Sequence, residues 1–269
     1  MVRIPNLFRS KTGLRLLTGV ALLACFCTPP WQRTNGFIDR NDLPLNITPL
    51  RGGVWLIQDF NYYPTNQVMY IDPDEGAVFV DATWTYKGAR QILWKAAANT
   101  RGDFLAVVLT GFPLFRTGGL DPFATHRMAI LMQRQTPRLM RENWDLMQDE
   151  MLRSFSSWRR FDPVPATVLF DRSVGLLEDR VHLYHFGPAF TPDSVIVHFP
   201  QERVIYAGSV LSDPPVFMDH AVLDGYDHVL DEIEKLDFDL IVSGHGEPLR
   251  DRTFVETVRE RVRRLRTRG

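Results

Sequence analysis

The stretch "HFGPAFTPDSVIVHFPQERVIYAGSVL", residues 185–211, decides the fold of this chain. Two apolar runs within it, "SVIVHF" and "RVIYA", are separated by a short polar turn. Runs of this length that are bounded by turn residues are typical of buried β-strands. The stretch therefore predicts two strands joined by a turn, with a glycine- and proline-containing loop before them and the loop "AGSVL" after them.

The same pattern continues on both sides of this stretch. Further strands are predicted at "GVWLIQ", "QVMYID", "GAVFVDA", "FLAVVLT", "ATVLF", "VHLYHF" and "FDLIVSG". Helical spacing predicts helices over residues 86–100, 136–158 and 225–236, and a closing helix from about residue 252. Strands and a helix, followed by strands and a helix again, predict two similar halves packed as a sheet sandwich with helices outside.

Composition and charge exclude several classes of protein. The chain has 269 residues, of which 45% are hydrophobic and 23% are charged. These values suit a globular protein with a full core, in one large domain or two small ones, and do not suit a disordered or fibrous chain. Removing residues 1–24 would take away four positive charges and no negative ones, so the formal net charge would move from −1 to −5. An acidic body of this kind argues against nucleic acid as the main partner.

The first residues predict export. Arg3, Arg9, Lys11 and Arg15 precede the apolar run "LLTGVALLACFC", which is too short to span a bilayer and has the length of a signal-peptide core. "LLAC", residues 22–25, resembles a bacterial lipoprotein cleavage box, and that resemblance implies lipidation of Cys25. A plain cleaved signal peptide and a retained anchor remain as alternatives.

This interpretation divides the chain into three parts. We predict a signal peptide over 1–24, a lipidated N-terminus and tether over 25–48, and the folded domain over 49–269. The protein would then be a membrane-anchored lipoprotein facing the periplasm or the cell surface. Cys25 and Cys27 are the only cysteines, so the folded part has no thiolate for catalysis or metal binding. The six arginines of the closing helix predict a solvated helix face, with attraction to anionic lipid as the alternative.

The order of these segments resembles the metallo-β-lactamase fold superfamily from about residue 52 to residue 250. "FVDAT", residues 79–83, resembles the family strand that ends in an aspartate, and residues 185–211 resemble its segment from G-P-A-H-T-P to A-G-D. "IVSGHGEP", residues 241–248, is similar to the family's P-G-H-G turn. The resemblance implies an α/β (α+β) fold, a four-layer αββα sandwich, and by default a zinc-dependent hydrolase.

The residues at the family's metal-ligand positions do not fit that default. "LTGFPLFRTGGL", residues 109–120, occupies the place of the family's T-H-x-H-x-D-H-x-G-G-L loop. By this resemblance the ligand positions here, and those of the two later segments, fall on Gly111, Pro113, Phe115, Arg116, Phe190 and Ser209. Zinc needs imidazole, thiolate or carboxylate donors, and an arginine has no acceptor atom. His245 alone remains, so we expect the zinc site to be lost and no cofactor to be bound.

Two interpretations of the altered site stay open. The resemblance places eight residues around one pocket: Gly111, Phe112, Pro113, Phe115, Arg116, Phe190, Ser209 and His245. Arg116 would form a salt bridge with Asp81 or Glu247 that holds the loops, or it would help to bind an anionic or amphiphilic small molecule. Ser209, His245 and Asp81 are also the residue types of a hydrolytic triad, although "AGSVL" lacks the G-x-S-x-G pattern.

A second group of possible metal ligands lies further along the chain. His220, Asp224 and His228 have the spacing of one helical face and could hold a cation there, but a polar helix face is the favoured interpretation.

The sequence as a whole favours a catalytically inactive lipoprotein of the cell envelope that binds a small molecule or an envelope protein. A hydrolase with a non-standard or metal-free site is the alternative, and a purely structural envelope module is a third possibility.

Overall fold

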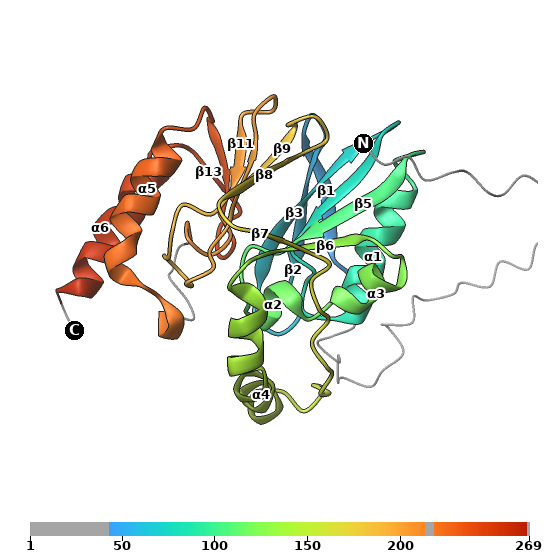
Figure 1. The fold of residues 1–269 in the computed structure, drawn as a ribbon, viewed down its shortest axis with the longest axis horizontal. Helices are drawn as coiled ribbons and strands as arrows, with labels where there is room; N and C mark the ends of the chain where they lie inside the picture. Colours follow the sequence, from blue (N-terminus) through green and yellow to red (C-terminus); the bar gives the residue numbers. More distant parts are fainter. Residues whose placement is uncertain (1–42, 213–217, 268–269) are drawn as a thin grey trace, which may run out of the picture. The chain divides into compact units, whose positions relative to one another are not determined.

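The computed structural model describes residues 43–212 and 218–267. Two β-sheets lie face to face, and helices cover the outer face of each sheet (Figure 1). This is the αββα sandwich that the sequence predicts. No helix in the described ranges is long and apolar enough to cross a membrane.

The first sheet contains seven strands in the order β1 to β7. The strands are β1 (Asn46–Arg51), β2 (Val54–Asp59), β3 (Thr65–Asp72), β4 (Gly76–Val80), β5 (Asp103–Val108), β6 (Ala129–Gln133) and β7 (Val168–Phe170). Strands β1 to β4 pair antiparallel, and β4 to β7 pair parallel. The carboxyl ends of β4, β5 and β6 therefore lie at one edge of the sheet, where loops can bring side chains together.

The second sheet contains six strands in the order β13-β12-β11-β10-β9-β8. They are β8 (Ser173–Leu176), β9 (Val181–Tyr184), β10 (Ile196–Phe199), β11 (Val204–Tyr206), β12 (Leu240–Val242) and β13 (Leu249–Arg250). Strands β10 and β11 are the two strands of the stretch 185–211, and they pair antiparallel through Val197 and Tyr206. Strands β11 and β12 pair parallel.

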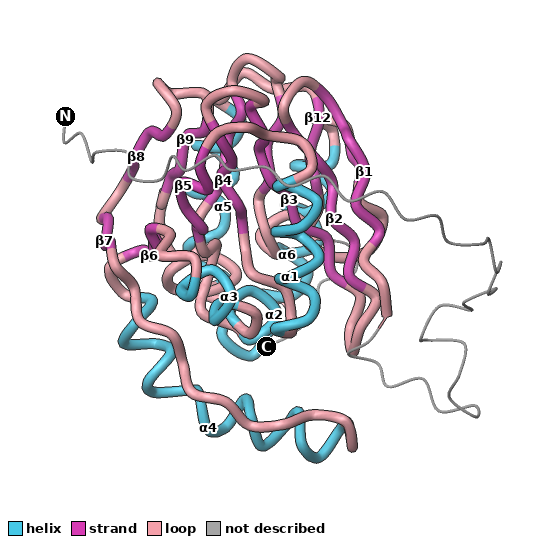
Figure 2. The backbone as a smooth tube through the Cα atoms, turned by 90° about the vertical axis from the view of Figure 1, so that its right-hand side faces the viewer, coloured by secondary structure: helices cyan, strands magenta, loops and turns pink. Residues whose placement is uncertain are grey.

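Helices complete the outer layers and one end of the sandwich. Figure 2 looks onto the side where the helices α1 (Tyr86–Ala97) and α3 (Leu120–Thr125) lie, and α5 (Tyr226–Glu234) and α6 (Phe254–Arg266) cover the second sheet. The short α2 (Leu114–Thr117) and the long α4 (Thr136–Ser154) lie at one end of the sandwich. Two short 3-10 helices, η2 (Met218–His220) and η3 (Leu223–Gly225), precede α5.

The side chains of a strand point alternately to the helix layer and to the other sheet, and this alternation explains how the layers pack. In β4, Ala77 and Phe79 face the helix side, whereas Val78 and Val80 face the second sheet. Successive side chains of a strand point to opposite faces, so a strand that is buried on both faces must be apolar at every position. All five residues of β4 are buried, as the continuous run "GAVFV" predicts.

Two glycines, Gly118 and Gly119, let the end of α2 lie close to the loop that follows β4. A Cβ on Gly118 would lie 2.3 Å from the Trp84 carbonyl oxygen, and one on Gly119 would lie 2.0 Å from the Ala82 carbonyl oxygen. Backbone atoms cannot move aside as a flexible side chain can, so only glycine permits this contact. The pair "GG" therefore brings α2, and with it Arg116, against the end of β4.

The structure also differs from the sequence predictions in a few segments. Strand β1 begins at Asn46, inside the segment predicted as a tether, and pairs with β2 through Asn46 and Gln58. Its burial pattern is mostly exposed, so it lacks the apolar run that marks a strand in the sequence. Helix α4 ends at Ser154 instead of residue 158, because Phe155 takes an extended backbone conformation.

Candidate functional site

Loops from both sheets meet around Arg116, at the end of the sandwich that carries α2. Asp81 follows β4, Thr110 follows β5, Ser209 follows β11 and His245 follows β12. The structure therefore brings together Arg116, Asp81, Ser209 and His245, which the sequence placed in one site. Asp81 and His245 lie far apart in the sequence, and the packing of the two sheets brings them into one site.

The Arg116 guanidinium is the centre of this site. It is 1% exposed. Its Nη1 donates to Asp81 Oδ2 at 3.0 Å, to the Tyr206 hydroxyl and to the Asn66 carbonyl oxygen, while its Nη2 donates to Ser209 Oγ at 2.8 Å. The guanidinium also lies 4.8 Å from the centroid of the Phe115 ring. Arg116 thus contacts both sheets through charged and polar atoms that are shielded from water.

Asp81 is the partner of Arg116. Of the two carboxylates that the sequence left open, Asp81 forms the ion pair, whereas Glu247 is exposed at the surface. Asp81 also accepts hydrogen bonds from the Thr110 backbone N–H and hydroxyl, both at 2.8 Å. Burial raises the pKa of Asp81, and the Arg116 charge and the Thr110 hydrogen bonds oppose that shift. The loss of Arg116 would leave this carboxylate buried with its main counter-charge removed.

Tyr206 and Asn66 complete the site, and the sequence did not reveal either of them. The Tyr206 hydroxyl lies 2.9 Å from both Asp81 Oδ2 and the Asn66 carbonyl oxygen, so it can donate its one proton to either. Burial raises the pKa of Tyr206 well above its ordinary value, so it stays a neutral donor. In the sequence Tyr206 belongs to the apolar run "RVIYA", where a tyrosine has the appearance of an ordinary core residue.

Ser209 and His245 form a hydrogen-bonded pair. The distance between Ser209 Oγ and His245 Nε2 is 3.1 Å, and His245 Nδ1 lies 3.1 Å from the Pro64 carbonyl oxygen. A carbonyl oxygen can only accept, so we assign the ring proton to Nδ1 and the serine proton to the bond with Nε2. Asp81 lies in the same site but does not complete the predicted triad, because its carboxylate binds Arg116, Thr110 and Tyr206 while His245 Nδ1 bonds the Pro64 carbonyl oxygen.

The environment of His245 makes it a weak base. Its pKa is lowered to about 3, chiefly by burial and also by the positive charge of Arg116, while the hydrogen bond to the Pro64 carbonyl opposes the shift. Moving the Ser209 proton to this ring would create an imidazolium in a buried site beside a guanidinium. A general base works best when its pKa lies near the operating pH. The pair has the geometry of a nucleophile and its base but lacks the basicity.

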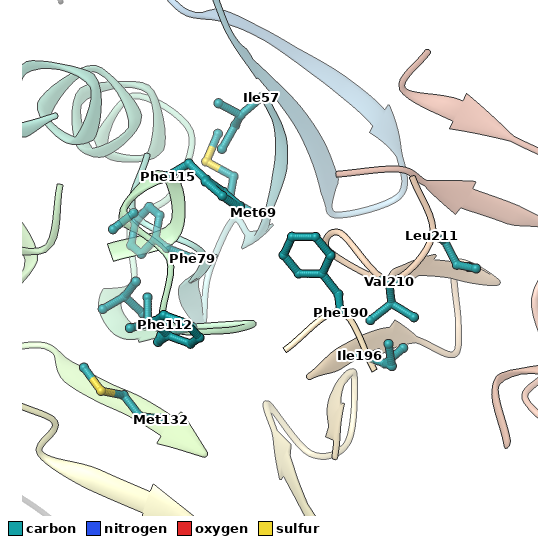
Figure 3. Close-up of a cluster of buried hydrophobic side chains, with 14 of the residues drawn as sticks. Ile57, Met69, Phe79, Phe112, Phe115, Met132, Phe190, Ile196, Val210 and Leu211 are labelled. Carbon is teal, nitrogen blue, oxygen red and sulfur yellow. The ribbon is translucent and has the colours of Figure 1, made fainter. Parts of the chain in front are cut away.

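The predicted pocket among these residues is closed. A cavity of about 10 Å³ remains there, lined in part by Gly111, Pro113, Phe115, Phe190 and Ser209, and a single water needs roughly 10–15 Å³. Figure 3 shows Phe115 and Phe190 among the buried hydrophobic side chains, and their ring centroids are 6.4 Å apart. The residues are neighbours as expected, but the space predicted for a small molecule is filled by their own side chains.

Two of the eight predicted lining residues, Phe112 and His245, do not line this cavity. His245 borders it only through its hydrogen bond to Ser209, whereas Phe112 points away from it. The Phe112 ring is fully buried and packs edge-on against His220 at 5.0 Å between centroids, so it does not line the cavity beside Arg116. Sequence position alone placed it next to Gly111 and Pro113, but adjacent residues of a loop can point to opposite sides.

A larger groove is separated from the closed site by the contact between Trp84, which lines the groove, and Phe115, which lines the closed cavity; their ring centroids are 5.6 Å apart. The volume of the groove is about 530 Å³, and aromatic residues form much of its lining. Tyr62, Trp84 and Trp158 pack edge to face at the base of the groove, with ring centroids 5.0–6.3 Å apart. Edge-to-face contacts of this kind are favourable beyond their burial. Charged residues stand at the rim: Lys87, Asp121, Arg159, Arg160 and Asp162.

The side chains around Arg116 do not fit a divalent metal. They offer the carboxylate of Asp81, which already binds the guanidinium, and one imidazole nitrogen, which already binds Ser209. A zinc ion requires several imidazole, thiolate or carboxylate donors within about 2.0–2.3 Å, and a fixed cation at the same place repels it. Across residues 43–212 and 218–267, no group of three or more His, Cys, Asp or Glu is placed to hold a metal ion.

The second histidine group does not form one helical face. His220 belongs to η2, Asp224 to η3 and His228 to α5, so the three residues lie on three separate elements. Four-residue spacing predicts a common face only when the helix is continuous, and here two short turns interrupt it.

The arginines of α6 are largely neutralised within the protein. Arg259 pairs with Asp231, Glu234 and Glu256, and Arg264 and Arg266 also form ion pairs with acidic residues. Arg268 lies outside the described residues. This pairing argues against attraction to anionic lipid. The predicted solvated face does not extend to Arg259, which is buried among its acidic partners.

Comparisons with known proteins agree with this architecture. The family model described as the metallo-beta-lactamase superfamily matches residues 63–245. The DIM-1 metallo-beta-lactamase superposes with a TM-score of 0.68 at 17% identity, over 83% of this chain and 99% of its own. FIM-1 from Pseudomonas aeruginosa, in its mono-zinc form, gives 0.69 at 17%, over 83% and 97%. A metallo-beta-lactamase from Pontibacter korlensis gives 0.68 at 18%, over 81% and 99%. At these identities the structural likeness establishes the fold alone.

Replacing Arg116 with methionine is expected to destabilise the protein strongly. The change leaves the buried Asp81 charge without its partner, and such a loss costs about 3–5 kcal/mol. The cost should be largest at pH 7 and smaller at pH 4.5, because protonation of Asp81 removes the unpaired charge. Urea unfolding of the wild type, Arg116→Met and the double variant Arg116→Met/Asp81→Asn measures it. The double variant should lose less than the single variant, and equal stability of Arg116→Met and wild type would contradict this role.

His245 is expected to make the protein sensitive to acid. Its folded pKa of about 3 lies below the ordinary value of 6.5, so the unfolded chain binds a proton between these values and the folded chain does not. Stability is therefore lost as the pH falls below about 6.5, by up to about 1.4 kcal/mol per pH unit. Urea unfolding from pH 6.5 to 4.5 should show a shallower decline for His245→Gln, and parallel curves would show that His245 is not the group responsible.

Proposed function

This chain belongs to the metallo-β-lactamase superfamily, and we propose that it is a catalytically inactive member that acts by binding at the cell envelope. Its ligand would be a small molecule or an envelope protein. One observation carries this proposal: the Arg116 guanidinium occupies the centre of the site and is held there by Asp81, Tyr206 and Ser209.

The chemistry of this centre supports the loss of metal-dependent hydrolysis. Hydrolysis by this route needs a bound water whose pKa is lowered by the metal, and the donors required to hold that metal are replaced. The guanidinium supplies one fixed positive charge without an open coordination position. It can hold loops together, but it cannot generate a hydroxide nucleophile.

The location at the envelope is proposed from the first residues of the chain. The positive residues, the apolar run and the "LLAC" box favour an exported lipoprotein that is anchored through Cys25. These residues lie outside the described part of the structure, so the proposal for them rests on the sequence.

The binding role is best supported at the aromatic groove lined by Tyr62, Trp84 and Trp158. Its volume of about 530 Å³ falls in the range of small-molecule sites, roughly 300–1,000 Å³, whereas the cavity at Arg116 is too small. The aromatic base of the groove and the charged residues at its rim suit an amphiphilic ligand. The proposed binding place thus differs from the one that the sequence suggested.

A metal-free hydrolase is the second candidate, favoured by the 3.1 Å hydrogen bond between Ser209 and His245. Against it stand the low pKa of His245, the bond from Arg116 to Ser209 Oγ and the closed cavity. A substrate would have to displace Phe115 or Phe190 to reach the serine oxygen.

Metal content and hydrolysis test the two candidates together. The chain lacking residues 1–27, purified without chelator and dialysed against trace zinc, should hold well under ~0.1 zinc per chain, because the donor set is missing. It should not hydrolyse ester, thioester, β-lactam or phosphodiester substrates, with or without zinc, and a fluorophosphonate probe should leave Ser209 unlabelled. The His245→Ala variant is the matched control. Turnover that disappears in this variant, or one tightly held zinc with chelator-sensitive activity, would overturn the proposal.

Anchoring through Cys25 has its own test. Cys25→Ala should move the full chain from the membrane fraction of the producing bacterium to the soluble fraction or leave it unprocessed, because the acylated thiol is removed. The neighbouring Cys27→Ala variant is the matched control and should behave as the wild type. Acyl-chain labelling that persists in Cys25→Ala, or that is absent from the wild type, would contradict the lipoprotein interpretation.

A further inference from the structure

The outer face of α1 carries an exposed aromatic and basic stripe. Tyr86, Arg90 and Trp94 are spaced four residues apart, so they lie in one row along the helix. Tyr86 is 48% exposed and Trp94 is 65% exposed. The Arg90 guanidinium lies 4.9 Å from the Trp94 ring centroid and 6.0 Å from the Tyr86 ring centroid. Two large aromatic side chains on either side of a cation thus face away from the core.

The charge of α1 differs in sign from that of the chain as a whole. Its twelve residues include Lys87, Arg90 and Lys95 and contain no aspartate or glutamate. The complete chain has a formal net charge of −1. The helix therefore presents a local positive surface on a mildly acidic protein, which suits an anionic partner.

A shallow hollow adjoins this stripe. It has a volume of about 420 Å³ and lies between α1 and the region around Phe104 and His126. Tyr86, Arg90 and Trp94 also line it. The surface thus combines exposed rings, cations and an apolar recess.

The described chain begins beside this helix. The Leu45 backbone N–H donates to Gln91 Oε1 of α1 at 2.9 Å. The preceding Leu43 exchanges two hydrogen bonds with Asn61. A chain that is anchored through its first residues would therefore reach the domain on the side where α1 lies.

We propose that the outer face of α1 docks on the surface of an anionic lipid bilayer, with Trp94 and Tyr86 at the headgroup level and Arg90 against the lipid phosphates. Tryptophan and tyrosine are enriched at membrane interfaces because one end of the ring system is apolar and the other is polar. Basic residues near an anionic bilayer each contribute about 1 kcal/mol, which corresponds to roughly a fivefold change in binding. This inference rests on the proposed location at the envelope.

Vesicle sedimentation tests the docking surface without the lipid anchor. The described residues, 43–212 and 218–267, belong to one compact unit, so the chain from residue 36 onward is a suitable protein. It should bind vesicles of equal phosphatidylglycerol and phosphatidylcholine more strongly than pure phosphatidylcholine, and rising salt should weaken the binding. Arg90→Gln should lower the partition coefficient about fivefold, and Trp94→Gln about tenfold through the lost burial of the ring. Leu146→Gln, at a 62% exposed leucine of α4, is the matched control and should leave binding unchanged.

Three results would overturn the docking surface. The first is binding without preference for anionic vesicles, and the second is an equal loss in Leu146→Gln. The third is self-association in the absence of lipid that disappears in Trp94→Gln, which would assign the stripe to a second copy of the chain. Because the test protein has no acyl group, its failure is distinct from a failure of anchoring through Cys25.

Discussion

The buried ion pair between Arg116 and Asp81 is the constraint on which the rest of the site depends. A charge that is removed from water must be matched by an opposite charge and by hydrogen bonds, or folding becomes costly. Thr110 supplies two donors to Asp81, and Tyr206 and Ser209 bind the guanidinium. These contacts tie the ends of strands from both sheets to α2. The buried polar network around Arg116 therefore holds the loops of the two sheets together. These loops cannot move apart without breaking the ion pair and leaving a charge unpaired.

The same polar network limits the chemistry of the site. Arg116 binds Ser209 Oγ and disfavours a second positive charge, so His245 stays neutral and is a poor proton acceptor. Phe115 and Phe190 fill the remaining space, which leaves a cavity too small for a ligand. The chain keeps the fold of the superfamily, but the centre of the site is buried and closely packed like a protein core. This contrast shows why a shared fold does not by itself assign a function.

Much of the architecture could be predicted from the residues alone. Continuous apolar runs such as "GAVFV" and the helical spacing of residues 86–100 correspond to β4 and α1. Strand β1 could not be predicted, because its side chains are mostly exposed and it is held by pairing with β2. The helical face expected from His220 to His228 was wrong, because two 3-10 turns interrupt that segment. Local patterns report burial well, but they do not report pairing or backbone breaks.

For the site, the sequence by itself determined which chemistry the residues permit: a guanidinium, a serine and phenylalanines do not supply the imidazole, thiolate or carboxylate donors of a zinc site. Only the tertiary structure decided which atoms meet. It selected Asp81 instead of Glu247 as the partner of Arg116, added Tyr206 to the network and closed the predicted pocket. The physical reason is that side-chain chemistry is local to each residue, whereas hydrogen-bond partners and cavity volume depend on how loops far apart in sequence pack at the end of two sheets.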